Sequence, residues 1–255
     1  GDVYKRQYRD NTLSGSFTPG SFFKIVTTAA AMERYPDSWS SITYNCQGAV
    51  ELAGSDITCL NGHAHGSQDM SAALGNSCNV YFAQLANDLG AEALQQKAEE
   101  MGFNTQIDFG SIPIAQSTID LADTNANQLG WAGVGQYTVL TNPYHMMVLM
   151  GAIANGGKAA EPYLIRKTVS SLGIPSLPHI TQHTGQLIDS RTAATVADFM
   201  ANNVTETYGT KRFPNMELCA KSGTAEVGTG QTPHAWFAGF LQNEDAPYAL
   251  SLIHI

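Results

Sequence analysis

Charge is scarce in this sequence. Charged residues make up 14% of its 255 residues, against roughly 25% in a typical soluble domain, and 22 acidic residues outnumber 13 basic ones. The net charge of -9 argues against a nucleic-acid partner, because binding to phosphates needs a basic face. Long apolar runs are also missing. The best run, 146–154, is shorter than the roughly 18 residues of a membrane span, and no secretory signal is present.

Cysteine is rare as well. Because no two cysteines form a Cys-x-x-Cys pair, we expect neither a zinc ribbon nor a thioredoxin-like motif. Cys46 and Cys59 flank a short segment with turn signals, and a disulfide between them is one interpretation in an oxidising compartment. Two free buried thiols are an equally good interpretation. The full set is Cys46, Cys59, Cys78 and Cys219.

Apolar residues, by contrast, make up 43% of the chain, which predicts a globular domain with a sizeable core. We expect one domain over 8–250, with a helical part over about 21–205 and a sheet hairpin over about 214–250. Between the first two helices, 36–68 is expected to be loop with short strands. The expected helices are 21–33, 69–74, 79–89, 91–101, 142–154 and 190–202, and the expected strands are 216–220 and 235–241, with another beginning at 248–250.

The two ends of the chain differ from the rest. Residues 1–7 and 251–255 have no helix caps and no continuity of pattern with their neighbours, and they resemble translated sequencing-adapter read-through. We therefore interpret both segments as non-native and expect the fold to lie between them, as a domain truncated at both ends.

The first chemical motif is Ser21-x-x-Lys24, which opens a buried helix after the Pro19-Gly20 turn. A spacing of three residues puts both side chains on one helix face, within reach of a hydrogen bond. Serine is a weak nucleophile until a base takes its proton, and lysine can be that base when burial and nearby positive charge lower its pKa. Because serine and lysine are common, this spacing alone is weak evidence.

Two further motifs contain hydroxyl, amide and amine groups. Ser77-x-Asn79 lies on the connection between two expected helices, where a pair of helix caps is the ordinary interpretation. Lys221-Ser222-Gly223-Thr224 lies on an expected strand, where Gly223 allows close approach of a ligand and a polar edge strand is the alternative. Neither motif is informative by itself.

The three motifs together are specific. Ser-x-x-Lys, Ser-x-Asn and Lys-Ser-Gly occur in the order found in penicillin-binding proteins and serine β-lactamases. Over about residues 10–250 the chain resembles the transpeptidase domain of penicillin-binding proteins, most closely the monofunctional class B type. The resemblance implies an α/β (α+β) β-lactamase/transpeptidase-like fold. It rests on the segments 17–25, 77–85, 135–136, 141–143, 152–157, 221–226 and 235–240.

The resemblance also implies a reaction. In this family a serine attacks the penultimate D-Ala carbonyl of a peptidoglycan stem peptide, and an amine of a second stem resolves the acyl-enzyme into a cross-link. By the match, Ser21 is the nucleophile, Lys24 the base for acylation, and Ser77 the proton relay to the leaving amine. β-Lactams would acylate Ser21 as mimics of the substrate. No cofactor or metal is implied, and we interpret His63 and His65 as loop histidines rather than ligands.

The remaining motif residues would bind the substrate. Asn79 would hold the substrate amide, and Lys221 would supply positive charge that keeps Lys24 partly neutral and attracts the terminal carboxylate. The hydroxyls of Ser222 and Thr224 would bind that carboxylate, and the backbone N–H groups of Ser21 and Thr224 would form the oxyanion hole. The resemblance further implies a parent protein that is anchored in the cell membrane, faces the outside of the cell and joins a cell-wall synthesis complex.

Three alternatives to a transpeptidase are disfavoured by the sequence. A class A β-lactamase needs a Glu-x-x-Asn arrangement, and no glutamate in the chain has asparagine three residues later. Class D β-lactamases and β-lactam sensor domains have an aliphatic residue where Asn79 stands. A catalytically dead scaffold is disfavoured by the intact motifs, but truncation would leave the sheet with two strands and part of a third. The strand of Trp236 would then lack a neighbour and a covering helix, so we expect a poorly stable chain that truncation can inactivate.

Overall fold

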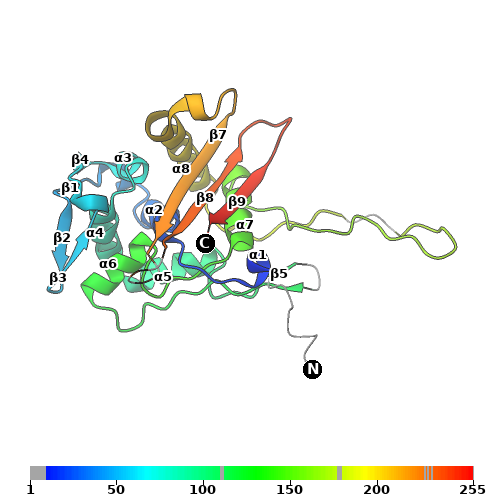
Figure 1. Ribbon diagram of the computed structural model, residues 1–255, viewed down its shortest axis with the longest axis horizontal. Coiled ribbons are helices and arrows are strands. Elements are labelled where there is room, and N and C mark those ends of the chain that lie inside the picture. Colours follow the sequence, from blue (N-terminus) through cyan, green and yellow to red (C-terminus); the bar gives the residue numbers. More distant parts are fainter. Residues whose placement is uncertain are drawn as a thin grey trace.

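A buried helix, α2 (Lys24–Arg34), lies at the centre of the molecule (Figure 1). The computed structural model describes residues 10–109, 112–176, 180–226, 228, 230 and 232–254. Every residue of α2 from Lys24 to Met32 is buried. A helix that is largely apolar or small on all sides has to be surrounded by other elements, and α2 packs against α4, α5, α6 and α8.

The other helices follow the cap residues of the sequence. Asp69, Asn142 and Asp189 each accept a hydrogen bond from a backbone N–H in the first turn, which agrees with the helix starts expected at 69, 142 and 190. Helix α6 was not expected from the sequence, although Asn125 and Gln128 form a capping box at its start. The helices are α1 (Asn11–Ser14), α3 (Met70–Gly75), α4 (Asn79–Leu89), α5 (Ala91–Glu100), α6 (Ala126–Val134), α7 (Pro143–Ala154) and α8 (Ser190–Asn202).

The main sheet is antiparallel, with the order β7 (Leu218–Ala225), β8 (His234–Leu241), β9 (Ala249–His254). The expectation that the strand of Trp236 lacks a neighbour is wrong, because β8 is the central strand and pairs with β7 and β9. Residues 251–254 belong to β9, so they are part of the fold from which the sequence analysis excluded them.

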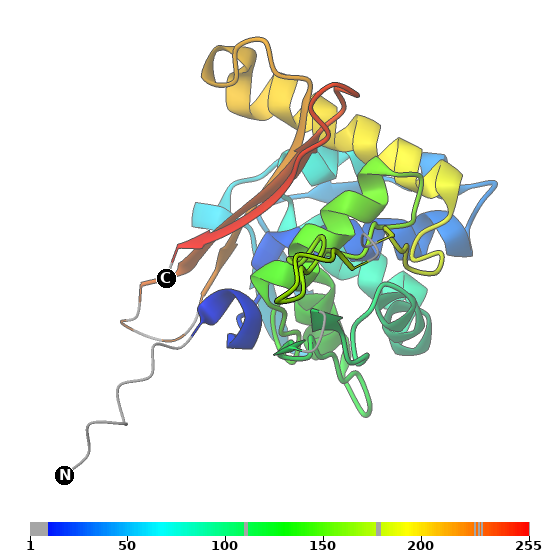
Figure 2. The same ribbon diagram turned by 90° about the vertical axis from the view of Figure 1, so that its right-hand side faces the viewer.

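The two faces of this sheet differ in cover. Figure 2 shows the helices gathered on one side of it, where α7 packs on β8 and β9 and α8 packs on β7. Trp236 and Phe240 are buried on that side. The expectation that the apolar face lacks a covering helix is therefore wrong for this face. On the opposite face, Leu250 and Leu252 are 47% and 54% exposed, and Phe237 is half-buried opposite Leu252 in the register.

Residues 36–68 form loops with short strands, as expected from the sequence. They form two antiparallel pairs beside α4 and α6 and bring the ends of three loops close to the start of α4. The pairs are β1 (Tyr44–Cys46) with β4 (Gly66–Gln68) and β2 (Ala49–Leu52) with β3 (Ser55–Thr58); a third pair elsewhere is β5 (Asp108–Phe109) with β6 (Ile112–Pro113).

Short helical turns complete the described chain. The 3-10 turn η2 (Gly20–Phe22) leads into α2, and the π-helical segment η5 (Asn203–Gly209) continues α8 toward β7. The remaining 3-10 turns are η3 (Trp39–Ser41), η4 (Leu60–Gly62) and η6 (Thr210–Arg212). None of the helices in the described part of the chain is long and apolar enough to cross a membrane.

Candidate active site

Ser21 and Lys24 face each other where η2 passes into α2. The Nζ of Lys24 lies 3.0 Å from the Oγ of Ser21, so the helical spacing read from the sequence produces the expected contact. Ser21 is partly exposed, whereas Lys24 is completely buried. Ser21 is therefore accessible from solvent, whereas the Lys24 amine contacts its hydroxyl from the protein interior.

Lys24 is also bound to the loop before α4. Its Nζ lies 2.6 Å from the carbonyl oxygen of Ser77, 3.3 Å from the Ser77 Oγ and 2.7 Å from the Oδ1 of Asn79. Burial, and then the charge of Lys221, hold the pKa of Lys24 well below its usual value of 10.5. The neutral form of Lys24 is therefore favoured, and the hydroxyls of two motif serines, Ser21 and Ser77, lie next to its amine.

Lys221 approaches the same serine from the sheet. Its Nζ lies 3.1 Å from the Ser77 Oγ and 2.8 Å from the carbonyl oxygen of Ser222. Lys221 is buried on β7, and this burial lowers its pKa to about 7. The Ser77 hydroxyl consequently lies between two buried amines, in a position to pass a proton.

Ser77 has a strained backbone. Its φ of 54° is in the left-handed region, which a residue with a Cβ adopts at a cost of about 1 kcal/mol or more. The amide of Asn79 helps to fix the loop, because its Nδ2 donates to the carbonyl oxygen of Thr58 over 2.8 Å. The tertiary contacts of this loop therefore hold a conformation that the sequence does not prefer locally.

Glycine allows the serine turn to lie directly on the sheet. A Cβ on Gly223 would lie 2.9 Å from the carbonyl oxygen of Pro19 and 3.2 Å from the N of Phe22. A Cβ on Gly20, whose φ is 55°, would lie 2.4 Å from the carbonyl oxygen of Thr224. These two glycines bring the backbones of η2 and β7 into contact, which places Ser21 beside the 221–224 motif.

Two longer-range contacts hold this turn in place. The N–H of Gly20 donates to the carbonyl oxygen of Gly135 over 2.9 Å, so the Gly135-Gln136 segment noted in the sequence contacts the turn directly. The indole Nε1 of Trp236 donates to the carbonyl oxygen of Thr18 over 2.9 Å. The first contact fixes the turn relative to the end of α6, and the second fixes it relative to β8.

Tyr208 is a site residue that the sequence analysis did not identify. Its hydroxyl oxygen accepts from the backbone N–H of Ser222 over 2.6 Å and from the Nδ2 of Asn203 over 2.8 Å. With two donors pointing at its oxygen, Tyr208 has to donate its own proton to the Ser222 Oγ, 2.9 Å away. The Ser222 proton is then free to point at a ligand. The π-helical turn that carries Tyr208 is a common feature of functional sites.

The predicted motif residues therefore converge. Ser21, Lys24, Ser77, Asn79 and Lys221 form one hydrogen-bonded cluster. Gly223 lies at the contact between η2 and β7, and Ser222 and Thr224 are the more exposed positions of the motif on that strand.

The structure distinguishes the two interpretations of the cysteines. The described cysteines are all free, and the Sγ atoms of Cys46 and Cys59 are 3.7 Å apart rather than joined. The structure thus shows two free buried thiols, the second of the two interpretations of Cys46 and Cys59, and not a disulfide. Cys78 and His65 lie in the same group, although the sequence led us to interpret His65 as a loop histidine. The sequence hides the group because its members are separated by different strands and loops.

A serine hydroxyl in contact with a buried lysine, with a second buried lysine nearby on the sheet, is the arrangement expected of an active-serine acyltransferase. The chain belongs to the family described as the penicillin binding protein transpeptidase domain, whose pattern it matches over residues 2–254.

Individual relatives agree with this assignment. The chain is 29% identical over 267 residues to the peptidoglycan D,D-transpeptidase PbpA of Mycobacterium tuberculosis, with 99% of the chain and 52% of that protein covered. It is 26% identical over 222 residues to the stage V sporulation protein D of Bacillus subtilis, with 86% of the chain and 34% of that protein covered. The chain spans about half the length, or less, of these curated relatives.

Solved structures show the same fold. Penicillin-binding protein A from M. tuberculosis, in its ceftriaxone acyl-enzyme complex, superposes with a TM-score of 0.88 at 26% identity, covering 96% of this chain and 56% of that one. The D,D-transpeptidase domain of a peptidoglycan glycosyltransferase from Eggerthella lenta gives a TM-score of 0.87 at 27% identity, with 96% and 62% covered.

Proposed function

We propose that this domain is a peptidoglycan D,D-transpeptidase that forms a serine acyl-enzyme on D-Ala-D-Ala stem peptides. The observation that carries the proposal is the 3.0 Å contact between the buried Lys24 amine and the Ser21 hydroxyl. A buried amine with a lowered pKa is a base for the serine hydroxyl at neutral pH. Penicillin and related β-lactams acylate the same serine.

In the first step Ser21 attacks the penultimate D-Ala carbonyl. The neutral Lys24 amine takes the proton of the Ser21 hydroxyl as the new C–O bond forms. The backbone N–H groups of Ser21 and Thr224 stabilise the oxyanion, and loss of one such donor typically slows an enzyme about 10²–10³-fold. The C–N bond to the terminal D-Ala then breaks, and Ser77 passes a proton from the lysine to the leaving amine.

In the second step an amine of a neighbouring stem attacks the acyl-enzyme. The amine forms a new C–N bond at the same carbonyl, the bond to the Ser21 Oγ breaks, and a proton returns to that oxygen through Lys24. Atoms and charges balance without a cofactor in either step. The product is a cross-link between two stems.

Substrate recognition is assigned to the sheet side of the site. Lys221 attracts the terminal carboxylate, and the hydroxyls of Ser222 and Thr224 donate to it. The Ser222 proton is directed outward by Tyr208, as its hydrogen bonds require. One N–H of the Asn79 amide donates to Thr58, and we assign the other to a substrate carbonyl.

We place the domain at the outer face of the cytoplasmic membrane, in a longer protein that is membrane-anchored and works in a cell-wall synthesis complex. This placement is supported by the peptidoglycan chemistry named for PbpA of M. tuberculosis, of which the chain covers 52%. Its test is cell fractionation of the parent protein, together with cross-linking to its neighbours.

The function is tested by labelling with a fluorescent penicillin and measurement of intact mass. We expect a stable adduct of one drug mass, which is absent in Ser21→Ala and present in Ser38→Ala, a change at an exposed serine outside the site. An adduct that clears within seconds would indicate a β-lactamase instead. Acylation without cross-linking or release of D-Ala from a pentapeptide would indicate a β-lactam sensor. A folded chain that forms no adduct would contradict the proposal and favour a dead scaffold.

A further inference from the structure

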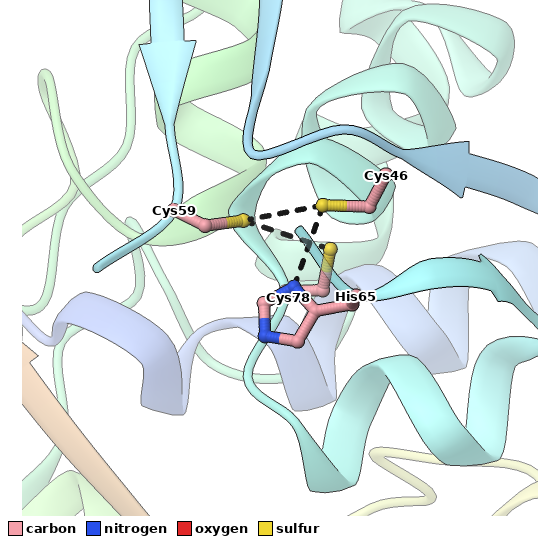
Figure 3. Close-up of side chains that lie close together, drawn as sticks. All are labelled: Cys46, Cys59, His65 and Cys78. Carbon is pink, nitrogen blue, oxygen red and sulfur yellow. Dashed lines mark hydrogen bonds between the residues drawn. The ribbon is translucent and has the colours of Figure 1, made fainter. Parts of the chain in front are cut away.

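Four potential metal ligands meet at the N-terminus of α4, next to the loop of Ser77 and Asn79 (Figure 3). Cys46 ends β1, Cys59 follows β3, His65 precedes β4 and Cys78 is the N-cap of α4. Their ligand atoms all lie within 4.8 Å of one another. The three cysteines are buried and His65 is half-buried, so the cluster is closed to bulk water on most sides.

Three of the six distances between the ligand atoms match those of tetrahedral zinc, and all six are within 4.8 Å. The Cys59 Sγ is 3.7 Å from the Sγ of Cys46 and 3.7 Å from the Sγ of Cys78, and the Nδ1 of His65 is 3.4 Å from the Cys46 Sγ. Ligands on a tetrahedron with Zn–S bonds of about 2.3 Å and a Zn–N bond of about 2.0 Å are separated by about 3.8 Å for two sulfurs and about 3.5 Å for sulfur and nitrogen. A disulfide would instead require a separation of about 2.05 Å.

Backbone N–H groups are directed at all three sulfurs. The N–H of Gly48 lies 3.4 Å from the Cys46 Sγ, and the N–H of Tyr81 lies 3.4 Å from the Cys78 Sγ. The N–H groups at the start of α4 hydrogen bond to Cys59. Such donors stabilise thiolates and orient metal ligands, which an apolar thiol cluster does not need.

We propose that Cys46, Cys59 and Cys78, through their Sγ atoms, and His65, through Nδ1, bind one Zn²⁺ ion in a structural Cys₃His site. Soft thiolate ligands with one imidazole select zinc among the common divalent metals, and four protein ligands leave no open position for catalysis. A disulfide between any two of the three cysteines would leave the third thiol and the histidine without a role. Zinc uses all four ligands and compensates the charge of the buried thiolates.

The site has a consequence for the loop that holds the catalytic groups. Cys78 lies between Ser77 and Asn79, both of which contact Lys24. A metal bond to Cys78 fixes the one residue between them and helps to hold Ser77 at its φ of 54°. This consequence for acylation rests on the proposed function, whereas the metal site does not.

The first test is metal analysis of the folded chain, purified under reducing conditions without chelator. We expect about one zinc per chain by inductively coupled plasma mass spectrometry. Replacement by Co²⁺ should give the thiolate charge-transfer band and the visible bands of tetrahedral cobalt. Less than one zinc per chain after zinc is supplied would overturn the site. Alkylation of all cysteines would then indicate free thiols, and a mass two hydrogens lower would indicate a disulfide.

Two matched pairs of variants locate the site. His65→Ala should lose most of the zinc, whereas His63→Ala, whose exposed ring lies 4.8 Å from that of His65, should retain it. Cys78→Ser should lose the zinc, whereas Cys219→Ser, a buried cysteine outside the cluster, should not. If Cys78→Ser fails to fold, the His65 pair still decides. Equal zinc in His65→Ala and His63→Ala would overturn the proposed ligand set.

A chelator experiment separates the metal site from the proposed function. Removal of zinc from the wild-type chain should lower its melting temperature and slow penicillin acylation, and re-added zinc should restore both. Zinc binding without any penicillin acylation would contradict the proposed function and leave the site intact. Acylation that is unchanged after complete removal of zinc would contradict the role of the metal in holding the loop.

Discussion

At the scale of single residues, the site is defined by two buried lysines. Lys24 and Lys221 share the Ser77 hydroxyl, and within the described part of the chain neither forms an ion pair with a carboxylate. Burial of a charged amine is unfavourable, so both pKa values are lowered. The same burial that lowers the pKa of Lys24, and so suits it to the proposed role of base, is therefore expected to reduce the stability of the fold.

Lys221 provides a test of this trade-off. Its pKa is about 7 in the fold and about 10.4 in an unfolded chain, so the unfolded state binds more protons between these values. The cost of burying Lys221 is therefore absent above about pH 10.4. This cost lowers the free energy of unfolding increasingly as the pH falls to about 7, and it is constant below that pH. We expect Lys221→Met to unfold at higher denaturant concentration than the wild type at pH 7, with a smaller difference at pH 9.5, and to acylate poorly. An equal difference at both pH values would contradict the burial of a charged amine.

Tyr208 provides a second test at this scale. Tyr208→Phe removes the hydroxyl that orients Ser222, and a lost hydrogen bond of about 1 kcal/mol corresponds to a roughly fivefold slower acylation by penicillin. Stopped-flow labelling of this variant beside Tyr137→Phe, a change at an exposed tyrosine, measures the effect. Equal rates for the two variants would show that Ser222 needs no such orientation.

At the scale of elements, the decisive contact is between η2 and β7. Without side chains at Gly20 and Gly223, the backbone of the serine turn lies directly on the strand that carries Lys221. The position of the nucleophile thus depends on the packing of two segments about 200 residues apart in the chain, at positions 20 and 223.

Gly223→Ala should disturb this contact. The new Cβ would lie 2.9 Å from the carbonyl oxygen of Pro19, so η2 has to move by a few tenths of an ångström or more. A displacement of this kind can slow a reaction by up to about 10²-fold. We expect slower penicillin acylation with a nearly unchanged circular dichroism spectrum. Gly185→Ala, where a Cβ meets nothing within 4 Å, is the control and should acylate at the wild-type rate.

At the scale of the whole molecule, the sheet has one covered and one open face. The helices cover the side of Trp236, whereas Leu250 and Leu252 remain about half exposed on the other side. Exposed leucines on a sheet favour association between molecules. The expectation of a poorly stable chain therefore stays a prediction, now based on this open face rather than on an unpaired β8.

Adjacent residues of β9 lie on opposite faces of the sheet, so each face can be tested by its own substitution. Leu252→Gln should reduce aggregation, measured by light scattering on heating, with little change in the melting temperature. Ile253→Gln, on the face that packs against the core, should lower the melting temperature by several degrees. Similar effects of the two substitutions would show that β9 does not distinguish the faces.

The stability of the chain itself is measured by calorimetry. We expect a transition below about 50 °C, the lower part of the usual range for a mesophilic domain. A cooperative transition well above that temperature would contradict the expectation, and would mean that the covered face of the sheet alone provides enough buried apolar surface.

The sequence by itself determined the helices and the chemistry of the motifs. Asn142, Asp189 and the Ser21-x-x-Lys24 spacing act within a few residues, so local rules predicted helix starts and the contact between Ser21 and Lys24. It also determined the family, because the three motifs occur in a fixed order.

Only the tertiary structure decided which distant groups meet. Tyr208 reaches Ser222 through a π-helical turn, and β8 gains its second neighbour from β9, of which the sequence indicated only the beginning. Cys46, Cys59, Cys78 and His65 come together from separate strands and loops. Local rules cannot detect such contacts, since their positions depend on how whole elements pack and not on the spacing of residues along one element.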